Sequence, residues 1–476
     1  MKNIFSVILC LFFYVLHSSA QDVTMKGSAP GAAGKTIKII SYADLITYNE
    51  KVLAKAIVDN KGNFSMTFPL TSTVYTKIKI MFGKTDLYLE PHKTYELMID
   101  SADYNVDDKY NPFLSPKLLN VSIINAEKNE LNSLMQKFNM LYNEYTFKHF
   151  DELYVLRQKN RVDTFRTIVN KNFPGVENEF FNAYVKYSIA SLEALTQYHT
   201  KLGMAKKYFI NQPVLYDNPA YMTYFNEFFE KYILGSSPKI TLNDIDRCVN
   251  KLKSVAALTD TLGKDTILRN EVLRELVMTK GLFDMYYTPG FEKENSLLLL
   301  NDIAANSKFE KHRTIAKDMI EAIDKLRIGT AAPPFTLNNI TGNKYSLTDF
   351  KGKYVYLIFW NTQCASCIRE MDAITKLKDT YAGKLEFVAI SSDREALTLK
   401  YYLEKKYFGF TMLHFGGNWD LLESYDIKAF PQTMLIDDQG KIAAYLPPLP
   451  SEGMENYLNQ LFNIIPPPKK NDGRKY

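Results

Sequence analysis

Two cysteines in the C-terminal part of the chain, Cys364 and Cys367, are separated by two residues. The apolar run 354–360 before them predicts a buried strand, and the pattern of 365–381 predicts a helix, so Cys364 stands where that helix begins. Free N–H groups and the helix dipole favour a negative charge at this place, and the thiolate is the nucleophilic form of cysteine. Two intervening residues leave the second sulfur within bonding distance, so Cys367 can expel whatever Cys364 captures. The pattern therefore predicts reversible thiol–disulfide exchange, with Cys364 as nucleophile and Cys367 as resolving thiol.

Zinc binding is the main alternative for a C-x-x-C pattern. A structural zinc ion needs four ligands, which a second such pair or a pair of histidines supplies. The sequence has no second C-x-x-C, and the nearest histidine, His414, stands alone. We therefore expect no metal, and no cofactor other than the redox-active cysteine pair itself. Cys248 lies in a predicted helix and is expected to be a buried thiol.

The segment 29–36, Ala-Pro-Gly-Ala-Ala-Gly-Lys-Thr, comes within one residue of a phosphate-binding P-loop. A working P-loop follows a strand and opens a helix. Here the segment would lie close to the mature N-terminus, and residues 37–40 after it predict a strand. We expect a β-turn at this place and no nucleotide binding.

The first twenty residues have the three parts of a secretory signal peptide. Lys2 supplies the positive charge, 4–16 is apolar, and 18–20 offers small residues for cleavage before Gln21. As a helix the apolar run would span about 20 Å, less than the ~30 Å hydrocarbon core of a bilayer, which favours cleavage over an uncleaved anchor. Cys10 lies inside the run, so lipidation at the cleavage point is not indicated. We expect an exported protein of the periplasm or cell envelope, soluble after signal cleavage and not an integral membrane protein.

Length and patterning predict several domains. A chain of 476 residues is too long for one compact core, and its formal net charge of +5 is too small to predict a nucleic-acid partner. Residues 22–121 predict a small antiparallel β-sandwich, and 122–327 carry apolar side chains at helical spacing, which predicts an all-α domain. In 328–465 strands and helices alternate, which predicts an α/β domain with a largely parallel sheet. The Pro- and Lys-rich tail 466–476 is expected to be disordered.

Several short motifs within 328–465 resemble the TlpA/ResA-like branch of the thioredoxin superfamily, an AhpC/TSA-related thioredoxin-fold domain. They are the opening 329–337, the segment 346–353, Phe359-Trp360 before the cysteines, Glu370-Met371 after them, and 429–433 followed by 435–437 and Gly440. The resemblance covers the C-terminal part of the chain and implies a thioredoxin fold there.

The resemblance also implies roles for further residues. Pro431 lies where the family has a cis-proline that faces the cysteine pair, beside backbone that pairs with an extended substrate. Trp360, which packs beneath the active-site loop, and Phe430 are assigned to substrate binding with it. Glu370 lies where this branch has a buried acid near the sulfurs, which can relay protons to or from the thiolate. Ile358 stands where thioredoxin itself has an aspartate, so Glu370 is the better acid–base candidate.

Some positions depart from the family pattern. Gln363 stands where tryptophan is usual, Asp372 where a helix proline is common, and Phe430 where a small or β-branched residue is usual. The dipeptide between the cysteines, Ala365-Ser366, tunes thiolate stability and hence the reduction potential. Because it contains no basic residue, it favours a reductant.

The expected function is that of an exported thiol–disulfide oxidoreductase that reduces or isomerises disulfides of envelope proteins. Its partners would be protein thiols and disulfides of the envelope, and an upstream electron donor such as a membrane thiol reductase. A peroxidase is a related alternative, but it needs a threonine three residues before its reactive cysteine, where this chain has Asn361. A second class stays open: an envelope protein that binds a ligand or peptide through its first two domains, with the thioredoxin domain secondary.

Overall fold

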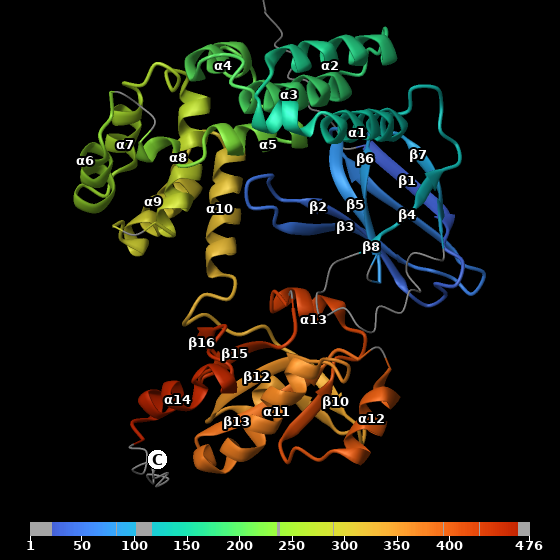
Figure 1. Cartoon of the computed structure of the whole chain (residues 1–476), viewed down its shortest axis with the longest axis vertical. Helices are drawn as coiled ribbons and strands as arrows, with labels where there is room; N and C mark the ends of the chain where they lie inside the picture. The colour runs from blue at the N-terminus through green and yellow to red at the C-terminus, as the bar shows by residue number, and fades with distance from the viewer. Residues whose placement is uncertain are drawn as a thin grey trace, which may run out of the picture.

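The computed structural model describes residues 21–81, 83–100, 117–235, 239–288, 290–393, 395–427 and 429–464. The predicted signal peptide 1–20 and tail 466–476 lie outside these residues. Figure 1 shows three parts: β-strands in blue, a layer of helices in green and yellow, and an α/β part in orange and red. Within the residues described, no helix has both the length and the apolar character needed to cross a membrane.

The β-rich part consists of two sheets, with strand orders β4-β1-β7-β9 and β3-β2-β5-β6-β8. The strands are β1 (Gln21–Ser28), β2 (Thr36–Tyr42), β3 (Glu50–Ile57), β4 (Asn63–Leu70), β5 (Val74–Ile80), β6 (Gly83–Leu89), β7 (Thr94–Ile99), β8 (Lys117–Leu118) and β9 (Val121–Ile123). Buried side chains of both sheets, such as Val23 from one and Ile39 from the other, belong to a single hydrophobic cluster, so the sheets pack face to face. Most strand pairs are antiparallel, as expected for this part, but β1–β7 and β6–β8 are parallel. The partners in these pairs are far apart in the chain, so no hairpin turn sets their direction.

The helical part contains ten α-helices among its described residues. They are α1 (Leu131–Lys148), α2 (Lys159–Asn172), α3 (Glu179–Leu195), α4 (Lys201–Tyr208), α5 (Pro219–Phe228), α6 (Leu242–Asp246), α7 (Val255–Leu262), α8 (Glu271–Tyr286), α9 (Lys293–Asn306) and α10 (Glu310–Asp324). Helices α3 to α8 each follow an Asn, Ser or Thr whose side chain accepts a backbone N–H of the first turn. Such N-caps satisfy donors that the helix itself leaves free.

Aromatic rings join the sheets to the helices. The ring centroids of Tyr42 and Tyr75 are 5.6 Å apart, and those of Tyr75 and Tyr88 are 5.4 Å apart. Tyr88 continues this series to Tyr184 of α3, at 6.2 Å. Aromatic pairs at such distances stabilise a contact by more than the area that they bury. These ring contacts therefore hold the helical layer against the sandwich.

A buried acid marks the contact of α10 with β3. The Asp318 side chain is 5% exposed and its Oδ1 lies 3.6 Å from Lys51 Nζ, while its Oδ2 has no hydrogen-bond partner among the described residues. Burial is the largest cause that raises the pKa of Asp318 above its ordinary value of 3.8, and Lys51 offsets only part of that effect. The folded state therefore disfavours the ionised carboxylate at neutral pH.

We expect the substitution Asp318→Asn to raise the midpoint of thermal unfolding at pH 7 by about 2 °C, measured by circular dichroism. Because the folded-state pKa is raised, the penalty is present at neutral pH and disappears as the pH falls below the unfolded value. The gain should therefore vanish near pH 3, where both the folded and the unfolded protein carry the neutral acid. A lower midpoint at pH 7 for the variant would show that the Lys51 contact outweighs burial.

The C-terminal part is a seven-stranded sheet with helices on its faces, in the order β11-β10-β14-β13-β12-β15-β16. Its elements are β10 (Thr336–Asn339), β11 (Lys344–Ser346), β12 (Tyr354–Trp360), α11 (Ala365–Leu377), β13 (Leu385–Ser391), α12 (Ala396–Lys405), β14 (Thr411–His414), α13 (Trp419–Ser424), β15 (Gln432–Ile436), β16 (Ile442–Tyr445) and α14 (Met454–Phe462). Among neighbouring strands only β12–β13 and β13–β14 are parallel pairs, and the other four pairs are antiparallel, so the expectation of a largely parallel sheet was wrong. The outer strands form hairpins, β10–β11 and β15–β16, which are antiparallel by construction.

Candidate active site

The two cysteines lie where β12 gives way to α11, at one edge of the sheet. Cys364 is the N-cap residue of α11, and its Sγ accepts the backbone N–H of Cys367 at 3.1 Å. The two residues form a disulfide, with their Cα atoms 5.2 Å apart. The helix predicted to begin near Cys364 therefore begins at Ala365, and the first sulfur lies at its positive end.

The two sulfurs differ in access to solvent. Cys364 is 7% exposed, whereas Cys367 is fully buried in the hydrophobic cluster beneath the loop. The Ser366 hydroxyl lies 3.2 Å from Cys364 Sγ. Of the two residues, Cys364 therefore lies nearer the molecular surface.

Pro431 lies beside the end of β12. The Phe430–Pro431 peptide is cis, and β15 begins at the next residue, Gln432, which pairs with Phe359. That register places Pro431 next to Trp360, where the chain turns into the cysteine loop. Pro431 is half-buried and Phe430 is buried in the same hydrophobic cluster as both cysteines.

Trp360 belongs to the core beneath this loop. Its side chain is fully buried, and its ring packs against Tyr402 and Phe408 with centroids 5.8 and 6.1 Å away. A fully buried ring offers no surface to a bound polypeptide. Its position fits support of the cysteine loop rather than the substrate contact assigned to it from sequence.

Glu370 follows Cys367 on the buried face of α11. Its carboxylate accepts two hydrogen bonds from Ser451, from the backbone N–H at 3.0 Å and from the hydroxyl at 2.6 Å. Spacing of three residues on one helix places Glu370 next to Cys367 along the helix surface. The carboxylate is thus fixed in a buried position close to the cysteine-bearing turn.

A second buried acid, Asp393, lies at the same edge and was missed from the sequence. It accepts the Thr362 N–H at 3.2 Å and the Thr362 hydroxyl at 2.7 Å, and the Ser391 hydroxyl donates to it at 2.5 Å. Thr362 lies two residues before Cys364, so this carboxylate holds the loop that presents the first sulfur. The signal in the sequence was the polar run 391–393 at the end of a buried strand. Parallel strands bring their carboxyl ends to one edge of a sheet, so such a run is expected to lie near the cysteine loop.

His414, set aside as a possible zinc ligand, extends this hydrogen-bonded series. Its Nδ1 accepts the backbone N–H of Gly416 at 3.1 Å, so its Nε2 carries the proton and donates to the carbonyl oxygen of Asp393 at 2.6 Å. The series runs from Thr362 through Asp393 and His414 to the loop after β14. It connects three neighbouring strand ends into one polar layer beside the cysteines.

The other motifs singled out from the sequence lie outside this site. Among the described residues no group of His, Cys, Asp and Glu is arranged to hold a metal ion. Cys248 is buried, with its Sγ 3.4 Å from the Thr261 hydroxyl. The segment 29–36 connects β1 to β2, so a strand does precede it, contrary to expectation, but the strand that follows replaces the helix that a P-loop requires.

In this site a parallel strand ends in a C-x-x-C disulfide at a helix N-terminus, and a cis-proline opens the neighbouring antiparallel strand. This combination defines the thioredoxin-fold class. The AhpC/TSA family matches residues 328–445. The thiol–disulfide oxidoreductase ResA of Bacillus thuringiensis is 31% identical over 140 residues, which cover 29% of this chain and 80% of that protein. The thioredoxin-like protein YneN of Bacillus subtilis is 36% identical over 128 residues, covering 24% of this chain and 68% of that protein. The chain therefore belongs to the TlpA/ResA-like family of thioredoxin-fold thiol–disulfide oxidoreductases.

A solved structure is similar over the same length. The thioredoxin domain of a thiol–disulfide oxidoreductase from Bacteroides vulgatus is 30% identical and covers 28% of this chain and 97% of that one, with a TM-score of 0.27.

Proposed function

We propose that this chain reduces or isomerises disulfides of exported proteins through the Cys364–Cys367 pair. The observation that carries the proposal is the position of Cys364 Sγ, which caps α11 and accepts the Cys367 N–H while its partner sulfur is buried. That arrangement stabilises an anion on the accessible sulfur only. In such a pair the two sulfurs have different roles: one attacks the substrate, and the other resolves the mixed disulfide.

The reaction starts from the dithiol form. The Cys364 thiolate attacks one sulfur of a substrate disulfide, forming a mixed disulfide and releasing the other substrate sulfur as a thiolate. The Cys367 thiolate then attacks Cys364 Sγ, breaks the mixed disulfide and releases the second substrate thiol. The substrate gains two electrons and two protons, and the enzyme pair is oxidised. An external dithiol donor, such as a membrane thiol reductase, restores the dithiol.

Glu370 and Pro431 complete the proposed site. Glu370 exchanges the proton of Cys367, because it lies on the same buried helix face three residues further on. The backbone beside Pro431 pairs with an extended stretch of the substrate, next to the accessible sulfur. No metal and no organic cofactor enters these steps.

Export supports the choice of substrate. Lys2, the apolar run 4–16 and the small residues 18–20 have the order of a secretory signal peptide, and disulfides persist in oxidising compartments outside the cytoplasm. We propose the periplasm or cell envelope as the place of action. Cell fractionation tests this, with the protein and its trapped substrates expected in the envelope fraction.

The proposal is tested by the pH dependence of alkylation of the reduced protein with iodoacetamide, in a Cys248→Ala background. Because the N-terminus of α11 favours the thiolate, we expect the midpoint of Cys364 alkylation to lie clearly below the ~8.5 of a free cysteine. The matched control is the unfolded protein in urea, where the midpoint should return to ~8.5. A midpoint near 8.5 in the folded protein would mean that the helix terminus does not activate this sulfur.

A further inference from the structure

The outer face of the five-stranded sheet carries a row of lysines. In the strand register Lys55 lies opposite Lys38, Lys38 opposite Lys79, and Lys79 opposite Lys84. Directly opposite residues project from the same face of a sheet, and like charges in such positions destabilise it. The alternate positions of β2 and β5 are buried isoleucines, so the lysine row faces away from the core of the sandwich. Because this lysine row lowers the stability of the sheet, its presence indicates a role other than folding.

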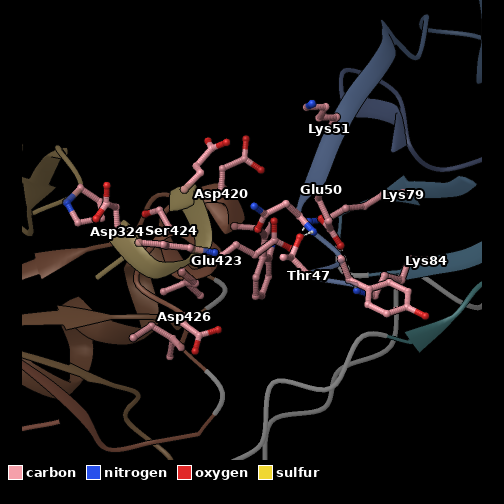
Figure 2. A pocket seen from close by; sticks show the side chains of 18 of the residues that line it. Thr47, Glu50, Lys51, Lys79, Lys84, Asp324, Asp420, Glu423, Ser424 and Asp426 are labelled. Atoms are coloured by element: carbon pink, nitrogen blue, oxygen red, sulfur yellow. Dashed lines mark hydrogen bonds and ion pairs between the residues drawn. The ribbon is translucent and has the colours of Figure 1, made fainter. Parts of the chain in front are cut away.

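The lysine row faces the C-terminal domain. Lys38 Nζ donates to both carboxylate oxygens of Asp420, at 2.7 and 2.6 Å, and Lys79 forms an ion pair with Glu423. Both acids lie on α13. Figure 2 shows these acids on one side of a hollow of about 880 Å³, with Lys51, Lys79 and Lys84 on the other. Electrostatic pairs thus hold α13 against the sandwich.

A second cavity, of about 770 Å³, adjoins the first and shares Lys79 and Asp420 with it. Its wall on the sandwich includes Lys35, Lys55 and the 71% exposed Ile57. Neither Lys35 nor Lys55 takes part in an ion pair within the described part of the chain, and both are exposed to solvent. The cavity therefore keeps free cationic side chains next to an apolar one.

The opposite wall of this cavity belongs to the edge of the sheet that carries the cysteines. Trp360 pairs with Ser391, and Ser391 with His414, so β12, β13 and β14 end side by side. The connections after these three ends carry Cys364, Glu395 and Asn418, and the last two line the cavity. Strands lie about 4.8 Å apart, so the end of β14 is about 10 Å from the end of β12. The hydrogen-bonded series from Thr362 to Gly416 spans the same distance.

We propose that this cavity binds an acidic segment of the substrate polypeptide while a disulfide next to that segment reacts at Cys364. The proposal rests on the proposed function and names the class of substrate that the site accepts. Four lysines and two acids line the cavity. Lys38 is already paired with Asp420, and Lys79 with Glu423. The two remaining lysines, Lys35 and Lys55, still outnumber the one remaining acid of the lining, Glu395. The surplus of positive charge attracts carboxylates, and Ile57 offers an apolar contact beside them. The sandwich then takes part in substrate selection.

The test uses two synthetic peptides that share one disulfide-bonded loop and differ in a flanking segment, which is rich in Asp and Glu in one and in Ser and Gln in the other. Reduction is followed with dithiothreitol as electron donor, and bis(2-hydroxyethyl) disulfide serves as an uncharged substrate too small to reach the cavity and the cysteines together. We expect kcat/KM for the acidic peptide to exceed that for the neutral peptide roughly fivefold at low salt. Near 1 M salt the Debye length falls to about 3 Å, and the preference should disappear.

The full-length double variant Lys35→Glu/Lys55→Glu should lose the preference and keep its rate on the uncharged disulfide, which also shows that it is folded. The variant Lys35→Gln/Lys55→Gln should give an intermediate preference. Lys159→Glu/Lys171→Glu, on the exposed surface of α2 in the helical layer, is the matched control and should keep the full preference. Equal rates for the two peptides with the wild type, or an unchanged preference in the Lys35/Lys55 variants, would overturn the proposal. Failure of the wild type on the uncharged disulfide would instead overturn the proposed function itself.

Discussion

Replacing Cys364 by serine is expected to lower the rate of insulin reduction by at least about 10³-fold, to the rate of the dithiol donor alone. The hydroxyl of serine is not ionised at neutral pH, so the anion that the N-terminus of α11 stabilises is missing. Cys248→Ala is the matched control, because that thiol is buried far along the chain and contacts Thr261 instead of the redox pair. Equal activity in wild type and Cys364→Ser would end the enzyme interpretation and favour the ligand-binding class.

The partner variant, Cys367→Ala, should give the opposite chemical outcome. Cys364 can still attack, but no second thiol can expel the substrate, so mixed disulfides accumulate. Non-reducing gels and mass spectrometry of envelope extracts should show covalent complexes that dithiothreitol releases. Complexes formed equally by Cys364→Ser/Cys367→Ala would show that another residue captures the substrates.

Of the substitutions considered, removal of the buried carboxylate that holds the cysteine loop is expected to have the second largest effect, in this case on the stability of the C-terminal domain. Asp393→Ala leaves the Thr362 N–H, the Thr362 hydroxyl and the Ser391 hydroxyl without their acceptor. Each unsatisfied buried donor costs about 1–3 kcal/mol, so we expect the free energy of unfolding of this domain to fall by about 3 kcal/mol. Urea unfolding followed by tryptophan fluorescence measures it, because Trp360 and Trp419 are the chain's two tryptophans and both lie in this domain.

A double-mutant cycle gives this prediction its control. Thr362→Val removes one of the same hydrogen bonds and should cost about 1 kcal/mol. Because both variants break that bond, the double variant should cost clearly less than the sum of the two. Strict additivity, or an Asp393→Ala midpoint equal to that of the wild type, would show that the carboxylate does not hold the loop.

The parts of the site that depend on neighbouring residues could be predicted from the sequence. The strand, the two cysteines and the first turn of α11 are contiguous, and their apolar and helical patterns are local. The contact of Asp393 with Thr362 depends on the parallel register of β12 and β13, which no local pattern reports. The lysine row likewise exists only once β3, β2 and β5 are aligned, since Lys55, Lys38 and Lys79 are unremarkable positions in three separate strands. The parallel pairing of β7 with β1 likewise depends on a contact between distant segments.

The tyrosine series from Tyr42 to Tyr184 has a mechanical consequence. The packed rings hold the sandwich and the helical layer together by apolar contact. The redox domain is held to these two parts by ion pairs on α13 and by the chain connection between Asp324 and Thr336. Salt weakens the second attachment and leaves the first intact. A high salt concentration should therefore let α13 separate from the sandwich while the sandwich and the helical layer stay packed together.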